Sequence, residues 1–235
     1  MATEHLSKQY DSELETLRSG VLQMGGLVES QIRSAIDAFA TGNQELITQV
    51  VATEIRVNEW ELNIDNDCSH IIVKRQPAAG DLRLIMAISK TVTDLERIGD
   101  EAEKIARMSK QIHDRGGRLQ VHSFANIRHA GDVAILMLRQ ALDAFARLDA
   151  VEAANVIRED VAIDNEFRSI LRQLITFMME DPRTISMALE IVWIAKAIER
   201  IGDHAKNIAE DVIYIVKGTD VRHTKFEEVE REALG

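Results

Sequence analysis

The motif Glu-Arg-Ile-Gly-Asp occurs twice in the sequence, at residues 96–100 and again at residues 199–203. Each copy places a glutamate four residues before an aspartate, and on an α-helix residues four apart lie on the same face. Each copy therefore presents two carboxylates together. Carboxylate oxygens are preferred ligands of hard cations such as Mg²⁺ and Mn²⁺, so the motif predicts metal binding. The acids concerned are Glu96, Asp100, Glu199 and Asp203.

A further pair of polar residues precedes each copy of the motif. In the second half this pair is Asp160 and Asp164, with the same spacing of four. The helix that carries it should pack beside the motif helix, so that two pairs present four carboxylates to one hard cation. The corresponding residues of the first half are Glu54 and Asn58. Because asparagine supplies only a neutral oxygen, we expect the second-half cluster to bind a cation more tightly.

The same acids also fit a helix face that is simply solvated. The apolar residues around each motif recur at steps of three and four, as in the seam of a helical bundle. With those residues in the core positions, Glu199 and Asp203 face outward, and the first copy behaves in the same way. Glycine inside a helix costs about 1 kcal/mol relative to alanine. Gly99 and Gly202 therefore indicate close approach of a neighbouring helix or of a bound group.

The sequence lacks the patterns that are typical of catalytic sites. The seven histidines are scattered, and none forms the Glu-x-x-His pair that an interior di-iron carboxylate bundle requires. No His-Glu-x-x-His, Gly-x-Ser-x-Gly or phosphate-binding glycine loop is present. Cys68 is the only cysteine, which excludes an intramolecular disulfide and fits a small apolar residue on a helix. We predict that the protein is not an enzyme.

The similarity between the two halves extends well beyond the motif. Residues 36–40 read IDAFA and residues 142–146 read LDAFA, and the order and spacing of such matches are the same in both halves. This pattern indicates a tandem duplication. Each copy holds three long helical stretches, separated by glycine, asparagine and proline residues that end helices. The predicted helices are 7–41, 43–74, 81–113, 120–148, 150–180 and 183–217.

These elements predict an all-α fold. Short connections force neighbouring helices to run antiparallel, so we expect a tandem repeat of two three-helix bundles with six long antiparallel helices. The first bundle should cover residues 1–115 and the second residues 118–217, with a linker at residues 115–118. Beyond residue 217 the apolar pattern fades, and we expect residues 218–235 to form an acidic C-terminal tail that frays.

The charge of the chain narrows the classes of partner. It has 39 acidic and 28 basic residues and a formal net charge of −11, which disfavours non-specific nucleic-acid binding and suits cations or basic protein surfaces. No run approaches the ~18 apolar residues of a membrane span, and the start shows no signal-peptide layout. We therefore expect a cytoplasmic protein.

Several segments together resemble the PhoU family. They are the duplicated Glu-Arg-Ile-Gly-Asp motif and the segments 24–26 (MGG), 74–77 (KRQP), 81–83 (DLR) and 178–181 (MMED). The likeness spans residues 14 to about 218, which is nearly the whole chain. It implies a negative regulator of the phosphate (Pho) regulon and a modulator of phosphate uptake. Such a regulator acts as an adaptor between a PstB-type ABC transporter ATPase and a PhoR-type sensor histidine kinase, and it commonly forms a homodimer.

The resemblance also implies bound divalent or trivalent metal ions, among which Mg, Mn, Fe and Zn are candidates. Carried onto this sequence, one cluster consists of Glu54, Glu96 and Asp100, and the other of Asp160, Asp164, Glu199 and Asp203. Asn58 departs from the acidic pattern of the first cluster. Two other readings compete with a metal-binding adaptor, namely a carboxylate-bridged metalloenzyme and a helical scaffold that binds no metal.

Overall fold

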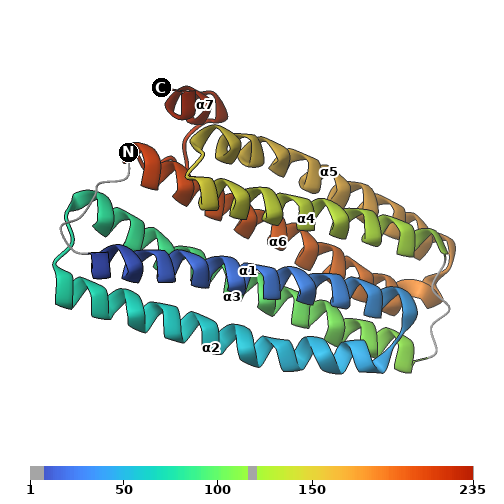
Figure 1. Ribbon diagram of the computed structural model, residues 1–235. Coiled ribbons are helices and arrows are strands. Elements are labelled where there is room, and N and C mark those ends of the chain that lie inside the picture. Colours follow the sequence, from blue (N-terminus) through green and yellow to red (C-terminus); the bar gives the residue numbers. More distant parts are fainter. Residues whose placement is uncertain (1–7, 116–120, 235) are drawn as a thin grey trace.

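The computed structural model describes residues 8–115 and 121–234 of the chain. Within these ranges it consists of two three-helix bundles that lie side by side, with a short helix at the C-terminal end (Figure 1). The six long helices are α1 (Lys8–Thr41), α2 (Gln44–Arg75), α3 (Ala79–Asp114), α4 (Val121–Arg147), α5 (Ala150–Glu180) and α6 (Ile185–Lys217). This arrangement confirms the predicted all-α fold with two repeats.

The helices end where the sequence supplies suitable residues. The side chain of Asn43 accepts a hydrogen bond from the amide of Glu45 at the start of α2, and Asp149 caps α5 in the same way. Gly218 ends α6 in the left-handed conformation, with φ of 79°, which glycine adopts without strain. A single 3₁₀ turn, η1 (Pro182–Thr184), leads into α6. The predicted linker, apart from Arg115, lies outside the described residues, so the boundary between the repeats stays a prediction.

The two bundles pack through α1 against α4 and through α3 against α6. A methyl group added at Gly25 would lie 2.5 Å from Cδ1 of Leu142, and one at Gly131 would lie 2.9 Å from Cγ1 of Ile36. Gly25 and Ile36 correspond to Gly131 and Leu142 in the duplication, so the two contacts are reciprocal. Such reciprocity is the property of an interface with two-fold symmetry, and here the symmetry relates two halves of one chain.

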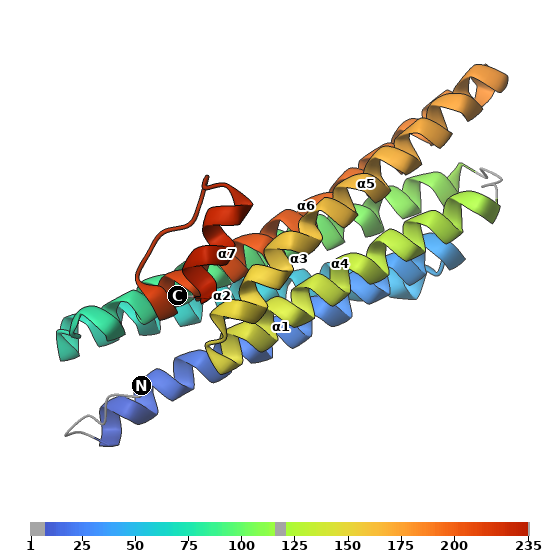
Figure 2. The same ribbon diagram turned by 90° about the horizontal axis from the view of Figure 1, so that it is seen from above.

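Polar contacts also join α3 and α6. Arg200 of α6 donates a hydrogen bond of 2.9 Å to the carboxylate of Glu101 on α3. Nδ1 of His204 lies 2.7 Å from Oδ1 of Asp94. A single hydrophobic core contains buried residues from all six long helices. Figure 2 shows that the helices of both bundles run along a common direction. The bundles therefore form one packed unit.

The C-terminal segment differs from the frayed tail that we expected. A seventh helix, α7 (Phe226–Leu234), packs against α5. Val229 and Ala233 are buried in this contact, and Arg158 of α5 lies over the ring of Phe226 and donates a hydrogen bond of 2.5 Å to Glu230. The expectation of a frayed tail was therefore wrong. The helix has only nine residues, which are too few to show a clear helical period in the sequence.

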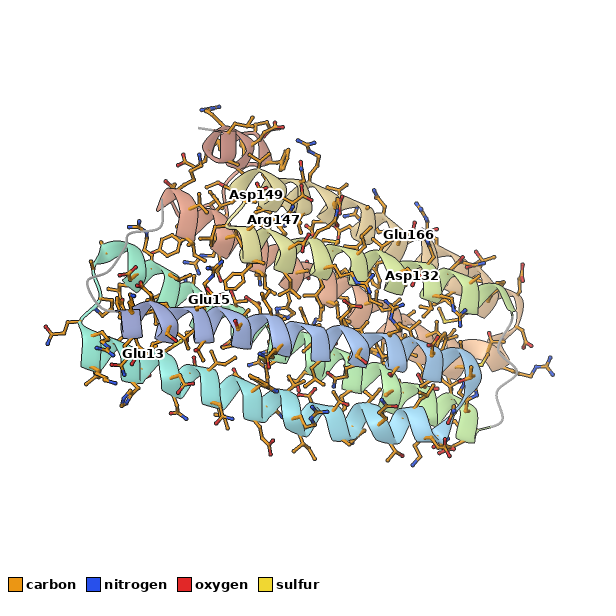
Figure 3. All side chains as sticks on the ribbon, in the orientation of Figure 1. Glu13, Glu15, Asp132, Arg147, Asp149 and Glu166 are labelled. Atoms are coloured by element: carbon orange, nitrogen blue, oxygen red, sulfur yellow. The ribbon has the colours of Figure 1, made fainter. Side chains whose placement is uncertain are left out.

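Exposed charged side chains cover the outside of both bundles. Glu15 on α1 and Asp132 on α4 are examples, and Figure 3 labels both. Among the described residues, no helix is long and apolar enough to cross a membrane.

Candidate metal centres

Several of the predicted ligands are less exposed than the outward helix face implied. Glu54 on α2 is 5% exposed and Glu199 on α6 is 8% exposed, whereas Asp100 stays exposed. The first motif, on α3, lies where this helix packs against α2, and the second motif, on α6, lies where that helix packs against α5. The neighbouring helix covers one side of each motif. The prediction of an outward face considered each helix by itself, so it did not include burial by the neighbouring helix. The acids lie at a seam between helices.

The first-half cluster is centred on Glu54. Its Oε2 accepts a hydrogen bond of 2.8 Å from the side-chain amide of Gln31 on α1. Its Oε1 is buried and has no hydrogen-bond partner among the described residues, and neither has Oδ1 of Asn58. A methyl group at Gly99 would lie 2.6 Å from Oε2 of Glu54. The glycine of this motif therefore makes room for a buried carboxylate.

Other acids surround Glu54 and oppose its ionisation. The pKa of Glu54 is raised to about 7, chiefly by burial; the negative charges of Asp100, Glu103 and Glu96 add to the rise, and the hydrogen bond from Gln31 opposes it. The pKa of Glu96 is also raised, first by burial and then by the charge of Asp100. Glu54, Glu96 and Asp100 are therefore close enough for their charges to interact, and their role as metal ligands stays a prediction.

The second-half cluster has the same motif acids, Glu199 and Asp203, but a different environment. Oδ2 of Asp160 accepts a hydrogen bond of 2.7 Å from Nζ of Lys206, and Oε1 of Glu199 accepts one of 2.5 Å from Nζ of Lys196. Oδ2 of Asp164 accepts a hydrogen bond of 3.3 Å from Arg168, which lies four residues later on the same helix.

The charges around Asp203 show which acids meet in this cluster. Burial raises the pKa of Asp203, and the charges of Glu199 and Asp160 raise it further, while Lys196 and Lys206 lower it. Asp160, Glu199 and Asp203 are therefore near one another. Asp164 instead pairs with Arg168 of its own helix.

Lys196, Lys206 and Gln31 were not identified from the sequence as neighbours of the acids. In the duplication Thr93 and Glu103 of α3 correspond to Lys196 and Lys206 of α6, and Met137 of α4 corresponds to Gln31 of α1. Extending the comparison of the two halves to these flanking positions would have revealed the difference. The comparison stopped at the acids and at Asn58, so it predicted the cluster with more aspartates as the stronger cation site.

The arginines of the two motif copies have different partners. Arg97 stays beside its own motif, with Nε 3.6 Å from Glu96 and Nη1 3.6 Å from Asp100. Arg200 instead reaches the opposite bundle, where it pairs with the buried Glu101. The identical residue thus has a local role in the first half and joins the two bundles in the second half.

Gly202 serves helix packing. A methyl group there would lie 2.9 Å from Cγ2 of Ile163 on α5 and would meet no polar atom among its three nearest neighbours. At this position, close approach of a neighbouring helix explains the glycine.

The donor chemistry of the first-half cluster fits a hard cation. It offers carboxylate oxygens, the unpartnered Oε1 of Glu54 and the unpartnered Oδ1 of Asn58; Arg97 pairs with Glu96 and Asp100, but no cation contacts Glu54 among the described residues. Within residues 8–115 and 121–234, no three His, Cys, Asp or Glu side chains already converge in the way a bound metal requires. Coordination therefore needs rotation of the more exposed acids, Glu96 and Asp100, toward Glu54.

The second-half cluster opens onto a groove between α5, α6 and the C-terminal segment. The groove has a volume of about 580 Å³. Asp160, Asp203 and Lys206 line it on one side, and Arg222 and Phe226 of the C-terminal segment line it on the other. Lys206 therefore shares the groove wall with two of the predicted ligands.

The fold and these clusters define a class of protein: a duplicated helical bundle with an acidic seam in each repeat. The sequence model described as the PhoU domain matches residues 21–109 and 127–212, one match in each repeat. The chain belongs to the PhoU family, which confirms the resemblance noted from its motifs.

Relatives of known name agree with this assignment. The chain is 49% identical over 233 residues to the phosphate-specific transport system accessory protein PhoU homolog of Pseudomonas putida, which covers 99% of this chain and 90% of that protein. It is 44% identical over 232 residues to the accessory protein PhoU of Escherichia coli K12, covering 99% and 95%. These names describe accessory proteins, in line with the prediction that the chain is not an enzyme.

Two solved structures share the fold. The crystal structure of PhoU from Pseudomonas aeruginosa matches with a TM-score of 0.85 and 49% identity, over 89% of this chain and 100% of that one. The phosphate transport system regulatory protein PhoU from Streptococcus pneumoniae matches with a TM-score of 0.83 and 26% identity, over 90% and 99%.

Proposed function

We propose that the protein is an accessory regulator of a phosphate transport system and a negative regulator of phosphate-responsive genes. The observation that carries this proposal is the 49% identity, over almost the whole chain, to a protein named as a phosphate-specific transport system accessory protein. The matching region includes both repeats and both acid clusters, so the relationship covers the features that we expect to act.

In this role the protein works as an adaptor with no chemistry of its own. The partners are an ATPase of the PstB type, from the phosphate ABC transporter, and a sensor histidine kinase of the PhoR type, and the adaptor acts in the cytoplasm as a homodimer. Six long helices around one continuous core supply a rigid body with large surfaces, which suits an adaptor. The net charge of −11 favours basic surfaces on the partners.

Metal binding belongs to the same proposal. Glu54, Glu96 and Asp100 would hold a divalent or trivalent cation, with the side-chain oxygen of Asn58 beside them. The support is the uncompensated charge at Glu54 and the buried oxygens without partners. A cation there would relieve repulsion among the carboxylates and tie α2 to α3. The alternative of a metal-free scaffold predicts the same fold and no bound metal.

Complementation tests the regulatory role directly. The chain is expressed in Pseudomonas aeruginosa from which its own PhoU homolog has been deleted, with alkaline phosphatase as the reporter and phosphate in excess. We expect the chain to restore repression of the reporter. If the protein accumulates to normal levels and the reporter stays high, the proposed regulatory function is wrong. A strain that expresses the resident PhoU homolog from the same promoter is the control.

A further inference from the structure

Two lysines set the second acid cluster apart from the first. Lys196 and Lys206 of α6 occupy the positions that Thr93 and Glu103 occupy on α3. We propose that these lysines are built-in counter-cations of the second-half cluster and exclude metal from it, so that the chain takes up its divalent cation at the first-half cluster alone. The second part of this inference rests on the metal binding proposed above; the exclusion by lysine stands on the second half by itself.

The lysines already occupy the oxygens that a metal would need. Nζ of Lys206 lies 2.7 Å from Oδ2 of Asp160, and Nζ of Lys196 contacts both carboxylate oxygens of Glu199. Asp203 lies near both lysines, which lower its pKa against the effects of burial and of the neighbouring acids. Each of the three acids that meet in the second half thus has an ammonium group beside it.

The ammonium groups are also held in place. The Nζ of Lys196 lies 5.5 Å from the centre of the Phe167 ring, a favourable position for a cation. The side chains of Lys196 and Lys206 are only 35% and 32% exposed, so neighbouring side chains restrict their movement. A divalent cation that entered this cluster would have to displace both groups and would then face two positive charges a few ångströms away. The three carboxylates would be a poor site for it.

The first half shows the opposite substitution. Where the second half has Lys196, Thr93 bonds to Glu61 of α2 at 3.2 Å and brings no charge. Where the second half has Lys206, Glu103 adds a further carboxylate, and its charge helps to raise the pKa of Glu54. The cations nearby, Arg97 and Arg107, are each about 60% exposed and lie at the rim. The buried oxygens of Glu54 remain without a cation from the described residues.

Counting bound Mn²⁺ tests the inference. Equilibrium dialysis of the full-length protein against Mn²⁺ gives the stoichiometry, and electron paramagnetic resonance of the free ion checks it. We compare the wild type with three variants. One carries Lys196→Thr and Lys206→Glu, which copy the first half. A second carries Asp160→Asn and Glu199→Gln, and its matched control in the first half carries Glu96→Gln and Asp100→Asn. Circular dichroism checks folding.

We expect the wild type to bind Mn²⁺, and the variant with Asp160→Asn and Glu199→Gln to bind it equally well. The variant with Glu96→Gln and Asp100→Asn should lose more than about tenfold in affinity. The lysine variant should gain a second class of site. Loss of Mn²⁺ from the second-half amide variant overturns the inference, and this variant keeps the test valid even if the lysine variant fails to fold.

The remaining outcomes separate the inference from the proposed function. If the wild type binds Mn²⁺ and the folded lysine variant gains none, the lysines do not exclude metal and the inference is wrong, while the proposed metal binding stands. If only the lysine variant binds, the lysines act as inferred and metal binding by the wild type is refuted. If no form binds Mn²⁺, both are refuted.

Discussion

The acid clusters of the two repeats lie on equivalent helices and share a motif, but they differ in how their charge is neutralised. In the first repeat Glu54 is buried beside other acids and has only the amide of Gln31 as a hydrogen-bond donor. In the second repeat Asp160 and Glu199 have the ammonium groups of Lys206 and Lys196. The two repeats differ here at two flanking positions, where Thr93 and Glu103 of α3 stand opposite Lys196 and Lys206 of α6 in the duplication.

The comparison also shows that an identical motif has no fixed role. Gly99 makes room for a carboxylate, and Gly202 makes room for Ile163. Arg97 stays beside its own acids, and Arg200 crosses to Glu101 in the other bundle. The neighbouring helix decides what each residue does.

The largest effect should come from a buried acid that only the second repeat has. Asp211, whose counterpart in the first repeat is Met108, is 5% exposed. Its pKa is raised to about 7, chiefly by burial; the charges of Asp94 and Glu210 add to the rise, and those of Lys90 and Arg222 oppose it. A raised pKa in the folded state means that stability is complete below about pH 4 and declines as the pH rises toward 7. Asp211→Asn removes this decline.

Urea denaturation at pH 5 and pH 8 measures that change. At pH 8 the Asp211→Asn variant should exceed the wild type in free energy of unfolding by on the order of 3 kcal/mol, and at pH 5 by much less. Met108→Leu, at the equivalent position of the first repeat, is the control and should leave the pH dependence unchanged. Parallel pH profiles for wild type and Asp211→Asn would show that Asp211 is not held neutral.

Removing the charge at one equivalent position of the two clusters, Lys206 in the second and Glu103 in the first, should have opposite consequences. Lys206→Met leaves Asp160 without its ammonium group. We expect a loss of about 1–2 kcal/mol in the free energy of unfolding, because the pair is only partly buried. Glu103→Gln, at the equivalent position, relieves Glu54 and gives up the exposed pair with Arg107. It should be neutral or slightly stabilising.

Chemical denaturation in the presence of a chelator compares these two variants without interference from metal. Raising the salt concentration should reduce both differences, since it screens the charges. Equal losses for Lys206→Met and Glu103→Gln would mean that the two clusters do not differ electrostatically, and the comparison would fail.

The smallest effect concerns the repeated glycines. In Gly202→Ala the new methyl group displaces Ile163, and the gain in helix propensity offsets part of the strain, so we expect a net loss of about 1 kcal/mol or less. Gly99→Ala should cost more, because the methyl group meets both the Glu54 carboxylate and Val57. The control is Gly26→Ala on α1, where nothing lies within 4 Å; it should be stabilising. Thermal denaturation of the three variants gives the order.

Much of the architecture was predictable because it rests on local and repeated signals. Steps of three and four between apolar residues indicate helices, and capping residues such as Asn43 and Asp149 mark where they begin. The duplication showed that the second bundle repeats the first. The candidate acids were predicted in the same way, since their spacing on a helix needs no knowledge of the fold; their role as metal ligands stays a prediction. Helix α7 was missed because nine residues show too little of a period.

What the tertiary structure alone decided is the environment of those acids. Position on a single helix placed Glu199 on an outward face, but α5 packs beside it and leaves 8% of it exposed. Gln31 and Glu54 are far apart in the sequence and meet only when α1 packs against α2. The sequence specified which groups each repeat carries, including Lys196 three residues before Glu199 on the same helix. Packing of α6 against α5 brought Lys206 to Asp160, because charge and burial also depend on neighbours from other helices.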